Sequence, residues 1–334
     1  METVVVTGSQ GFIGSYICRD LLEQGYRVIG VDNYSKYGYV KREHDDHNNF
    51  CFIESDIARD PDPFGRIDTP VDYVICGAAM IGGIRYFHKY AYDLMAINER
   101  IMAATYDWII SLIKKPKKVV ILSSSMVYEG CDIFPLREEY VYNHQTQVPN
   151  STYGFQKLAC EYFAKGAWEQ YQIPYDVVRP FNAVGVGEED CATGESHVIP
   201  DLVYKIMTGN GKIQILGDGT QTRCYTHVKD VARGVRMVME SEAHGREFNI
   251  ASERETSVNQ LIELIDQRTV RYPRVNEVTP GDMLPYDVQR RVPSTTYAWH
   301  TLGFKTIHSL EEAISEIIKD VEAKLLCQAY QNSQ

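Results

Sequence analysis

Two side chains on one predicted helix could act together in proton transfer. Tyr153 and Lys157 are four residues apart within the helical pattern of residues 152–171, so both lie on one face of that helix. An unperturbed tyrosine keeps its proton up to about pH 10, but a lysine ammonium one turn away stabilises the phenolate. Such a tyrosine can take or return the proton of a hydroxyl group while a hydride moves to or from a cofactor.

A run of serines upstream supports this interpretation. The strand pattern of residues 118–123 ends in Ser123 and continues with Ser124 and Ser125. In a doubly wound sheet the carboxyl ends of the strands face the ligand crevice. A serine there can hydrogen-bond the same oxygen that the tyrosine deprotonates, although serines after a strand are also common turn formers.

The start of the chain has the pattern of a dinucleotide-binding turn, in which a strand, three glycines, a helix, a second strand and an acid follow one another. These parts are residues 3–7, Gly8, Gly11 and Gly14, residues 12–24, residues 27–31 and Asp32. The glycines permit the tight turn, the approach of a pyrophosphate and close packing of the helix on the sheet. The helix N-terminus attracts the phosphates, and the acid is placed to bind an adenosine ribose.

The residues around this acid favour NAD over NADP. Asp32 would repel the 2′-phosphate of NADP, and its neighbours Asn33, Tyr34 and Ser35 include no arginine to receive one. Lys36 is the nearest cation. The sequence therefore predicts NAD as the cofactor.

The composition is that of an ordinary globular protein with an acidic surface. The 334 residues suffice for two modest domains or one large one, and the net charge of −11 argues against a nucleic-acid partner. No apolar stretch approaches the roughly 20 residues that span a bilayer, and no signal peptide precedes the first strand, so we expect a cytoplasmic protein. The eight cysteines and nine histidines show no metal-ligand spacing, so we expect no metal site.

Short apolar runs alternate with helical patterns up to Pro180. Because apolar strands that are each followed by a helix form parallel sheets covered on both faces, the sequence predicts an α/β fold with a doubly wound parallel Rossmann sheet. The other strands and helices expected are residues 50–54, 73–77, 93–113, 118–123, 152–171, 175–179 and 247–250.

The alternation fails after Pro180, which predicts a smaller C-terminal lobe interleaved with the last Rossmann strand. The expected division is a NAD-binding domain of residues 1–180 with about 230–255, and a substrate-binding lobe of about 181–229 with 256–334. Within the lobe we expect a strand at residues 212–216, irregular chain at 272–299, an amphipathic helix at 310–326 and a frayed polar tail after Cys327.

Several further motifs occur in a characteristic order. They are TGSQGFIG (7–14), Asp32, Asp56-Ile57, Gly77-Ala78-Ala79, Asn98, SSSMVY (123–128), YGFQK (153–157), RPFN (179–182), VIP (198–200) and GDGTQTRCYTHVKD (217–230). In these motifs the chain resembles, over nearly its whole length, the extended short-chain dehydrogenase/reductases that act on nucleotide sugars. The resemblance implies a nucleoside-diphosphate sugar as substrate.

The resemblance also implies roles for individual residues. The catalytic residues would be Ser124, Tyr153 and Lys157. The cofactor would contact Gly8, Gly11, Phe12, Ile13, Gly14, Asp32, Asn33, Asp56, Ile57, Ala78, Ala79, Asn98, Tyr153 and Lys157. The substrate would contact Ser125, Met126, Arg85, Asn182, Val198, Leu202, Arg223 and Arg291, with Arg290 as an alternative to Arg291. Arg223, together with Arg291 or Arg290, would bind the diphosphate through charge-assisted hydrogen bonds.

The residues after the catalytic serine favour one reaction of this family. Its 4,6-dehydratases have Asp-Glu next and its decarboxylases usually a glutamate shortly after, whereas this chain has Ser125 and Met126. Glu129 comes later, where the family usually has glycine. The resemblance therefore favours a 4-epimerase of a UDP-sugar, working through a transient 4-keto intermediate. A dehydratase or decarboxylase, a 4-ketoreductase and a non-catalytic NAD sensor stay open as alternatives.

Two further segments suggest contacts, one with the substrate and one with a second subunit. Residues 80–93 are longer and more aromatic than the family's loop near the sugar, and they form either a covering loop or a wall in which Arg85 or His88 meets the substrate. The helices at residues 93–113 and 152–171 resemble the pair through which the family forms a homodimer as a four-helix bundle. Candidate contacts there are Tyr162, Phe163, Ala159 and Trp108.

Overall fold

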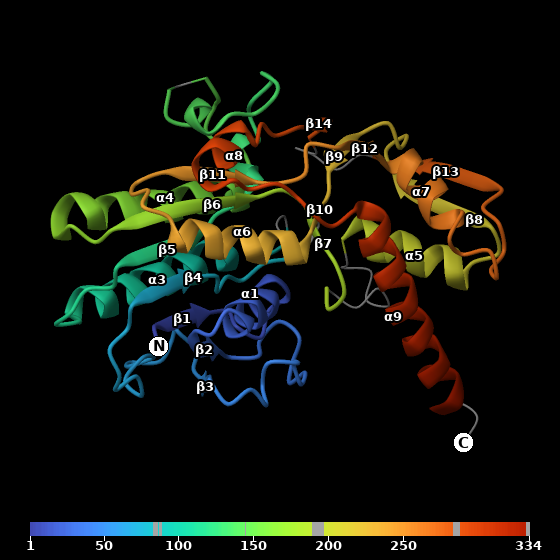
Figure 1. Cartoon of the computed structure of the whole chain (residues 1–334). Helices are drawn as coiled ribbons and strands as arrows, with labels where there is room; N and C mark the ends of the chain where they lie inside the picture. The colour runs from blue at the N-terminus through green and yellow to red at the C-terminus, as the bar shows by residue number, and fades with distance from the viewer. Residues whose placement is uncertain (83–85, 87–88, 144, 189–196, 283–287, 332–334) are drawn as a thin grey trace.

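Seven parallel strands form the central sheet, in the order β11-β6-β5-β4-β1-β2-β3 (Figure 1). The computed structural model describes all residues except 83–85, 87–88, 144, 189–196, 283–287 and 332–334. The strands are β1 (Thr3–Thr7), β2 (Arg27–Asp32), β3 (Phe50–Glu54), β4 (Tyr73–Cys76), β5 (Lys118–Leu122), β6 (Tyr175–Pro180) and β11 (Glu247–Ile250). Most of their residues are buried, as expected where helices cover both faces of a parallel sheet.

Two pairs of helices cover this sheet. They are α1 (Phe12–Glu23) with α6 (Val228–Glu240) on one face, and α3 (Ala91–Ser111) with α4 (Thr152–Tyr171) on the other. Within β1, Val4 packs with the first pair and Val5 with the second, because successive strand residues point to opposite faces. The predicted doubly wound parallel sheet is confirmed.

The remaining long elements gather on one side of the sheet in a smaller lobe, from which the last helix extends (Figure 1). They are α5 (Val198–Thr208), β8 (Lys212–Leu216), α7 (Val258–Asp266), β13 (Glu277–Gly281) and α9 (Leu310–Gln331). The two strands pair in parallel, and the three helices share one hydrophobic core with β8. The domain boundaries stay a prediction.

The other elements of the described residues are short. They are η1 (Ser125–Tyr128), η2 (Glu138–Tyr140), β7 (Ala183–Val184), β9 (Thr222–Cys224), β10 (Thr226–His227), β12 (Glu255–Ser257), β14 (Arg290–Arg291) and α8 (Thr296–Leu302). The first of them, η1, begins directly after the strand β5, so the serine run of the sequence forms the turn at the carboxyl end of a central strand.

The structure differs from the sequence-based expectations mainly after Pro180. Helices α5, α6, α7 and α8 were not expected, and the segment of residues 272–299 contains strands rather than only irregular chain. The frayed tail expected after Cys327 is wrong, because α9 runs to Gln331. No glycine or proline interrupts the residues before that end, so a helix already formed can continue through them.

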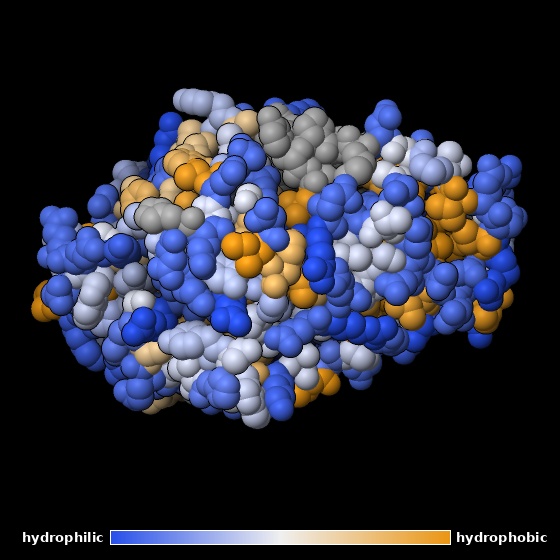
Figure 2. All heavy atoms as spheres, turned by 90° about the horizontal axis from the view of Figure 1, so that it is seen from above, coloured by the Kyte–Doolittle hydropathy of each residue, from blue (hydrophilic) through white to orange (hydrophobic). Residues whose placement is uncertain are grey.

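The face of the molecule drawn in Figure 2 is mainly hydrophilic, with apolar side chains exposed in separate small groups. This agrees with the acidic composition. In the part of the chain that the structure describes, no helix combines the length and the apolarity that crossing a membrane requires.

Candidate active site

A cavity of about 1970 Å³ lies along the carboxyl ends of the central strands and extends to α5 and β8. The strands contribute residues at their ends, such as Asp32 of β2 and Leu122 of β5, and the lobe contributes residues such as Val198 and Leu216. Single small-molecule sites usually measure about 300–1,000 Å³. The cavity is therefore large enough for a dinucleotide together with a second ligand.

The glycine turn forms one wall of this cavity. Gly8 has a φ of +75°, a backbone conformation that side chains rarely adopt, and a Cβ on Gly14 would lie 1.9 Å from the Gly8 carbonyl oxygen. Helix α1 starts after Gly11, which has no side chain to cap the first N–H groups. Phe12 and Ile13, at this helix start, line the cavity. An uncapped helix N-terminus behind a glycine turn fits a pyrophosphate.

Asp32 is held in place at the end of β2. Its Oδ2 accepts a hydrogen bond from the backbone N–H of Gln10 (3.0 Å), and its Oδ1 accepts one from the N–H of Tyr34 (2.8 Å). The carboxylate and the neighbouring Asn33 both line the cavity. Carboxylate oxygens still have acceptor capacity after these bonds, which fits the diol of an adenosine ribose.

Two further segments complete this half of the cavity. Asp56 and Ile57 follow β3, and the Asp56 carboxylate pairs with Arg59 (2.8 Å). Ala78 and Ala79 follow β4, and Thr7 Oγ1 accepts the N–H of Ala78 (3.1 Å). The residues present therefore fit NAD along its length, from the adenosine end at β2 and β3 to the centre of the sheet.

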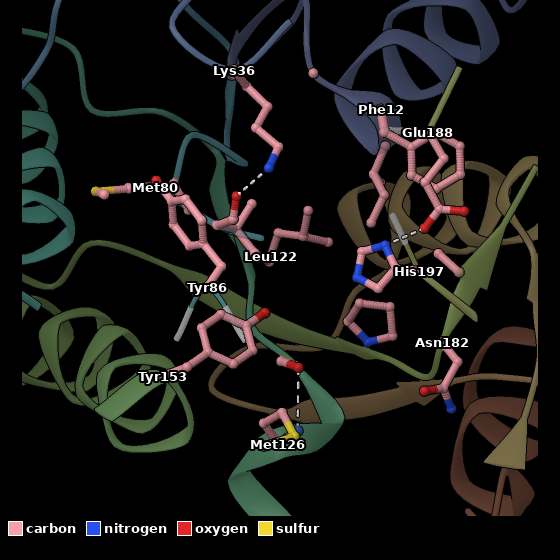
Figure 3. A pocket seen from close by; sticks show the side chains of 18 of the residues that line it. Phe12, Lys36, Met80, Tyr86, Leu122, Met126, Tyr153, Asn182, Glu188 and His197 are labelled. Atoms are coloured by element: carbon pink, nitrogen blue, oxygen red, sulfur yellow. Dashed lines mark hydrogen bonds and ion pairs between the residues drawn. The ribbon is translucent and has the colours of Figure 1, made fainter. Parts of the chain in front are cut away.

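Tyr153 and Lys157 lie next to each other at the start of α4, as their spacing predicts. Both are buried and line the cavity, and Lys157 Nζ lies 5.9 Å from the centre of the Tyr153 ring. Lys157 Nζ donates a hydrogen bond to the Leu122 carbonyl at the end of β5 (3.0 Å), which anchors it beside the strand end. Figure 3 shows the Tyr153 hydroxyl pointing into the space between Leu122, Asn182 and His197.

Ser124 caps the short helix η1 at the same edge of the sheet. Its Oγ accepts the N–H of Met126 (3.2 Å), so its own hydroxyl proton can be donated to an oxygen in the cavity. The Met126 side chain packs with Tyr153 and Leu94 in one apolar cluster. The structure thus brings Ser124 and Tyr153 to one wall of the cavity, with an apolar side chain beside the phenol.

Residues 123–128, called the serine turn below, approach α4 closely at Gly154. A Cβ at this position would lie 2.8 Å from the Met126 carbonyl oxygen and 2.7 Å from Pro149 Cβ. Real Cβ atoms do not come this close to backbone, so the glycine is required for this contact. The helix that carries the tyrosine and the turn that carries the serine are therefore in direct contact.

Two residues singled out from the sequence act behind the cavity wall. Asn98 is buried and does not line the cavity. Its Oδ1 accepts the N–H of Met80 (2.6 Å), and its Nδ2 donates to the Met80 carbonyl oxygen (3.0 Å). Glu129 does not line the cavity either, and its Oε2 accepts the N–H of Ser151, the N-cap residue of α4 (2.8 Å). Asn98 therefore positions the segment after Ala79, and Glu129 ties the serine turn to the start of α4.

The lobe supplies the opposite half of the cavity. Asn182, with a φ of +38°, donates from its side chain to the Cys224 carbonyl (3.0 Å). Arg291 is buried, and its Nη1 donates to Ser125 Oγ (3.4 Å). The expected substrate contacts that line the cavity are Ser125 and Met126 of η1, and farther along the chain Asn182, Val198, Leu202, Arg223 and Arg291. Arg290, the alternative to Arg291, instead pairs with Glu255 outside the lining (2.9 Å).

Part of the aromatic segment 80–93 also faces the cavity. Tyr86 and Lys36 lie on one side of it in Figure 3, where Lys36 Nζ donates to the Ile81 carbonyl (2.7 Å) and lies 5.2 Å from the Tyr86 ring centre. Arg85 and His88, the substrate contacts considered from the sequence, lie outside the described residues.

Sequence reasoning missed several residues of the lining. Glu188 and His197 contact each other through Oε1 and Nδ1, across the cavity from Tyr86 in Figure 3. Gln214 and Leu216 line the cavity from β8. The alternation of side chains along a strand could have identified the last two, because residues two apart share a face of the strand expected there.

The family model described as "NAD dependent epimerase/dehydratase family" matches residues 4–251 of this chain. The chain therefore belongs to this family of NAD-dependent enzymes that act on nucleotide sugars, and the predicted cofactor, NAD, is confirmed.

Relatives within the family carry out different reactions. UDP-N-acetyl-alpha-D-glucosaminuronate decarboxylase of Bacillus cytotoxicus is 27% identical over 319 residues, covering 94% of this chain and 96% of its own. A putative UDP-glucose 4-epimerase of Methanocaldococcus jannaschii is 32% identical over 269 residues, covering 78% of this chain and 81% of its own. The crystal structure of UDP-glucose 4-epimerase from Thermotoga maritima with UDP-glucose has a TM-score of 0.81 and 27% identity, covering 97% of this chain and 99% of that one.

These similarities establish an enzyme family that includes epimerases, dehydratases and decarboxylases. The choice among the three reactions has to come from the site itself.

Proposed function

We propose that the protein is an NAD-dependent nucleotide-sugar 4-epimerase whose substrate is a UDP-sugar. The observation that carries this proposal is the wall around Ser124 and Tyr153, where Ser125 and Met126 follow the serine and Met126 packs on the phenol. Among the described residues that line the cavity between Ser123 and Met126 and from α4, none has a carboxyl group that could add or remove a proton at a second carbon. This arrangement supports chemistry at one carbon atom.

In the proposed reaction the chain moves one proton at the sugar's C4 hydroxyl. Tyr153 takes this proton, and Lys157, held at the end of β5, stabilises the phenolate by its charge. Ser124 donates its hydroxyl proton in a hydrogen bond to the same sugar oxygen. NAD supplies the hydride acceptor and donor for C4. Return of the hydride to the opposite face of the 4-keto sugar, with the proton returned by Tyr153, inverts the carbon and gives no net redox change.

The lobe would hold the nucleotide and leave the 4-keto sugar free to rotate, so that its opposite face meets the cofactor. Arg223 and Arg291 are the candidates for the diphosphate, since guanidinium groups bind phosphate oxygens in pairs. Val198 and Leu202 of α5 are the candidates for the base, and Asn182 for the sugar or its phosphate. Uracil is proposed because the relatives with UDP-sugar names include epimerases.

A decarboxylase is the second candidate, supported by the similarity to the Bacillus cytotoxicus enzyme. A substrate carboxylate would find a cation in Arg291, whose Nη1 lies 3.4 Å from the Ser125 hydroxyl. In that reaction the carboxylate of the 4-keto intermediate would leave as carbon dioxide, the electrons of the broken bond would form an enolate at the 4-keto oxygen, and water would supply the proton that C5 then needs.

The test is a panel of nucleotide sugars incubated with the purified protein and followed by mass spectrometry and proton NMR. We expect a product of unchanged mass with inverted C4, no accumulation of reduced cofactor, and no product with Tyr153→Phe. Loss of carbon dioxide or water from the substrate would contradict the epimerase and assign the protein to the lyases.

We also propose that the protein is a homodimer through α3 and α4. The exposed aromatic residues of α4, such as Phe155 and Tyr162, support this. Of the other candidate contacts, Trp108 stacks on Phe64 (4.4 Å) and Phe163 packs against the core, so both mainly cover the sheet.

A further inference from the structure

A buried ion pair lies directly behind the catalytic residues. The side chains of Arg179, on β6, and Glu161, on α4, are both fully buried and lie outside the lining of the cavity. Arg179 holds the carboxylate by two hydrogen bonds, from Nε to Oε1 (2.9 Å) and from Nη2 to Oε2 (2.7 Å). A bidentate pair of this kind fixes the relative position of the strand and the helix that carry its two partners.

Two hydroxyl groups complete the hydrogen bonding of this carboxylate. Ser123 Oγ donates to Glu161 Oε1 (2.6 Å), and Tyr142 Oη donates to Glu161 Oε2 (2.6 Å). Burial, and then the charge of Glu161, raise the pKa of Tyr142 well above its ordinary value, so this phenol keeps the proton that it donates. The two donors lie in different segments: Ser123 belongs to the serine turn, and Tyr142 does not.

Ser123 links the ion pair to the residues that carry the chemistry. It directly precedes Ser124, and its Oγ also lies 3.5 Å from the Lys157 carbonyl oxygen. Glu161 is one helical turn beyond Lys157 and two turns beyond Tyr153 on α4. The hydrogen bond between Ser123 and Glu161 therefore joins the strand end that carries the serine to the helix that carries the tyrosine.

The same arginine holds the other end of the turn. Arg179 Nη1 donates to Tyr128 Oη (2.8 Å), at the end of η1, and this phenol donates to Asn249 Oδ1 of β11 (2.8 Å). The turn η1 is thus fixed at its start through Ser123 and at its end through Tyr128. Between these points its backbone contacts α4 at Gly154, so a shift of the turn changes its distance from Tyr153.

We propose that Ser123, Glu161 and Arg179 are positioning residues that set the distance between Ser124 and Tyr153. The inference rests on the proposed function for the roles of Ser124 and Tyr153. A hydroxyl has to come within about 2.6–3.2 Å of the oxygen that it serves. A displaced turn therefore slows the proton and hydride step and leaves binding of the nucleotide and of NAD unchanged.

Ser123→Ala and Tyr142→Phe are a matched pair for the test. Each removes one hydroxyl donor from Glu161 and leaves the ion pair intact, so both are expected to lower the unfolding temperature to a similar extent. Only Ser123→Ala is expected to lower kcat, on the order of tenfold to a hundredfold, because small misplacements of catalytic groups are that costly. Its KM and NAD content should match the wild type, and its bound NAD should be reduced more slowly in a single turnover.

A second measurement needs no substrate. Hydrogen–deuterium exchange of the amides of residues 123–128 should be faster in Ser123→Ala than in the wild type and in Tyr142→Phe. An unchanged kcat in Ser123→Ala, an equal loss of kcat in both variants, or a loss confined to KM would overturn the proposal. Should the wild type convert no nucleotide sugar, the proposed function fails, and equal exchange in all three proteins then overturns this inference separately.

Discussion

At the residue scale, the contact between Gly154 and the Met126 carbonyl makes the geometry of the site sensitive to one carbon atom. In Gly154→Ala the new Cβ would lie 2.8 Å from that carbonyl oxygen, so the serine turn or the helix has to move. We expect kcat to fall roughly tenfold or more, with a small change in KM. Steady-state kinetics of the purified variant, together with its NAD content, measure this.

Gly166→Ala is the control for this prediction. Gly166 is on the same helix, and a Cβ there would meet nothing within 4 Å. Alanine in the interior of a helix is more stable than glycine by about 0.5–1 kcal/mol, so this variant should be slightly stabilised with unchanged kcat. Equal kinetics in the two variants would show that the close contact at Gly154 has no part in catalysis.

Glu247 carries a pH dependence of stability. Burial raises its pKa from an ordinary 4.5 to about 7, with Arg179 opposing and Glu161 adding to the shift. The protonated form is favoured in the folded protein, so the contribution of this group to stability is complete below about pH 4.5 and is lost as the pH rises through about 7. Glu247→Gln should therefore gain stability relative to the wild type as the pH rises, by up to about 3 kcal/mol.

Urea unfolding of both proteins between about pH 5 and pH 8 measures this difference. Glu169→Gln makes the same change of charge on the exposed side of α4, and we expect its difference from the wild type to be nearly flat over this range. A flat difference for Glu247→Gln as well would mean that its carboxyl titrates like an exposed one.

The sequence could identify residues whose chemistry depends on spacing within one segment. The glycine turn, Asp32, Ser124 and the pair of Tyr153 and Lys157 follow that rule, and the structure brings them to one cavity. The sequence could not identify the hydrogen-bonding roles of Asn98, Ser123 or Glu129. Their partners, such as Met80 and Glu161, are far away in the chain and become neighbours only when the strand ends and α4 assemble.

At the element scale, the sheet was predictable and much of the C-terminal lobe was not. The strands are uninterrupted apolar runs separated by helical patterns, which parallel sheets require. Helix α6 was missed although Val228, Val231, Val235 and Val238 recur at helical spacing. It follows two very short strands and a glycine-rich motif, so the alternation of strands and helices gave no sign of it.

Helix α6 connects the sheet with the lobe through Asp230. This buried carboxylate accepts the N–H groups of Ile307 (3.0 Å) and His308 (2.9 Å), in the segment that leads into α9. Both bonds go to Oδ2, while Oδ1 accepts from Arg233 Nη2 (3.0 Å). In Asp230→Asn an NH₂ group replaces one of these oxygens and the charge is lost, so one set of partners loses its acceptor, which should cost about 1–3 kcal/mol of stability. Because this segment holds the lobe, we also expect KM for the nucleotide sugar to rise while NAD stays bound.

Asp20→Asn is the matched variant for this prediction. Asp20 pairs with Arg236 of the same helix (2.7 Å), but on the side that packs on α1, within the sheet part of the protein. It should lose stability without a rise in KM. A similar rise of KM in both variants would show that α6 has no particular role in holding the lobe. Equilibrium unfolding and steady-state kinetics provide the two readouts.

At the scale of the whole molecule, the two halves of the cavity come from different parts of the chain. The sheet supplies the NAD half, from the glycine turn to Ala79, and the lobe supplies Val198, Arg223 and Arg291. Tyr153 and Ser124 lie where the two meet. Because different segments supply the two halves, residues of one half can change without altering the other, which fits a fold that serves several reactions.

The proposed homodimer can be tested on the exposed face of α4. Tyr162 and Phe155 are 54% and 44% exposed and seven residues apart, so they lie on one side of the helix. In a two-fold interface each substitution counts twice. Tyr162→Glu should therefore raise the dissociation constant of the dimer on the order of a hundredfold or more. Val270→Glu, an exposed apolar position on the lobe, should leave it unchanged. Sedimentation velocity over a range of concentrations distinguishes them, and a wild type that sediments as a monomer, or two variants that behave alike, would contradict dimerisation through this face.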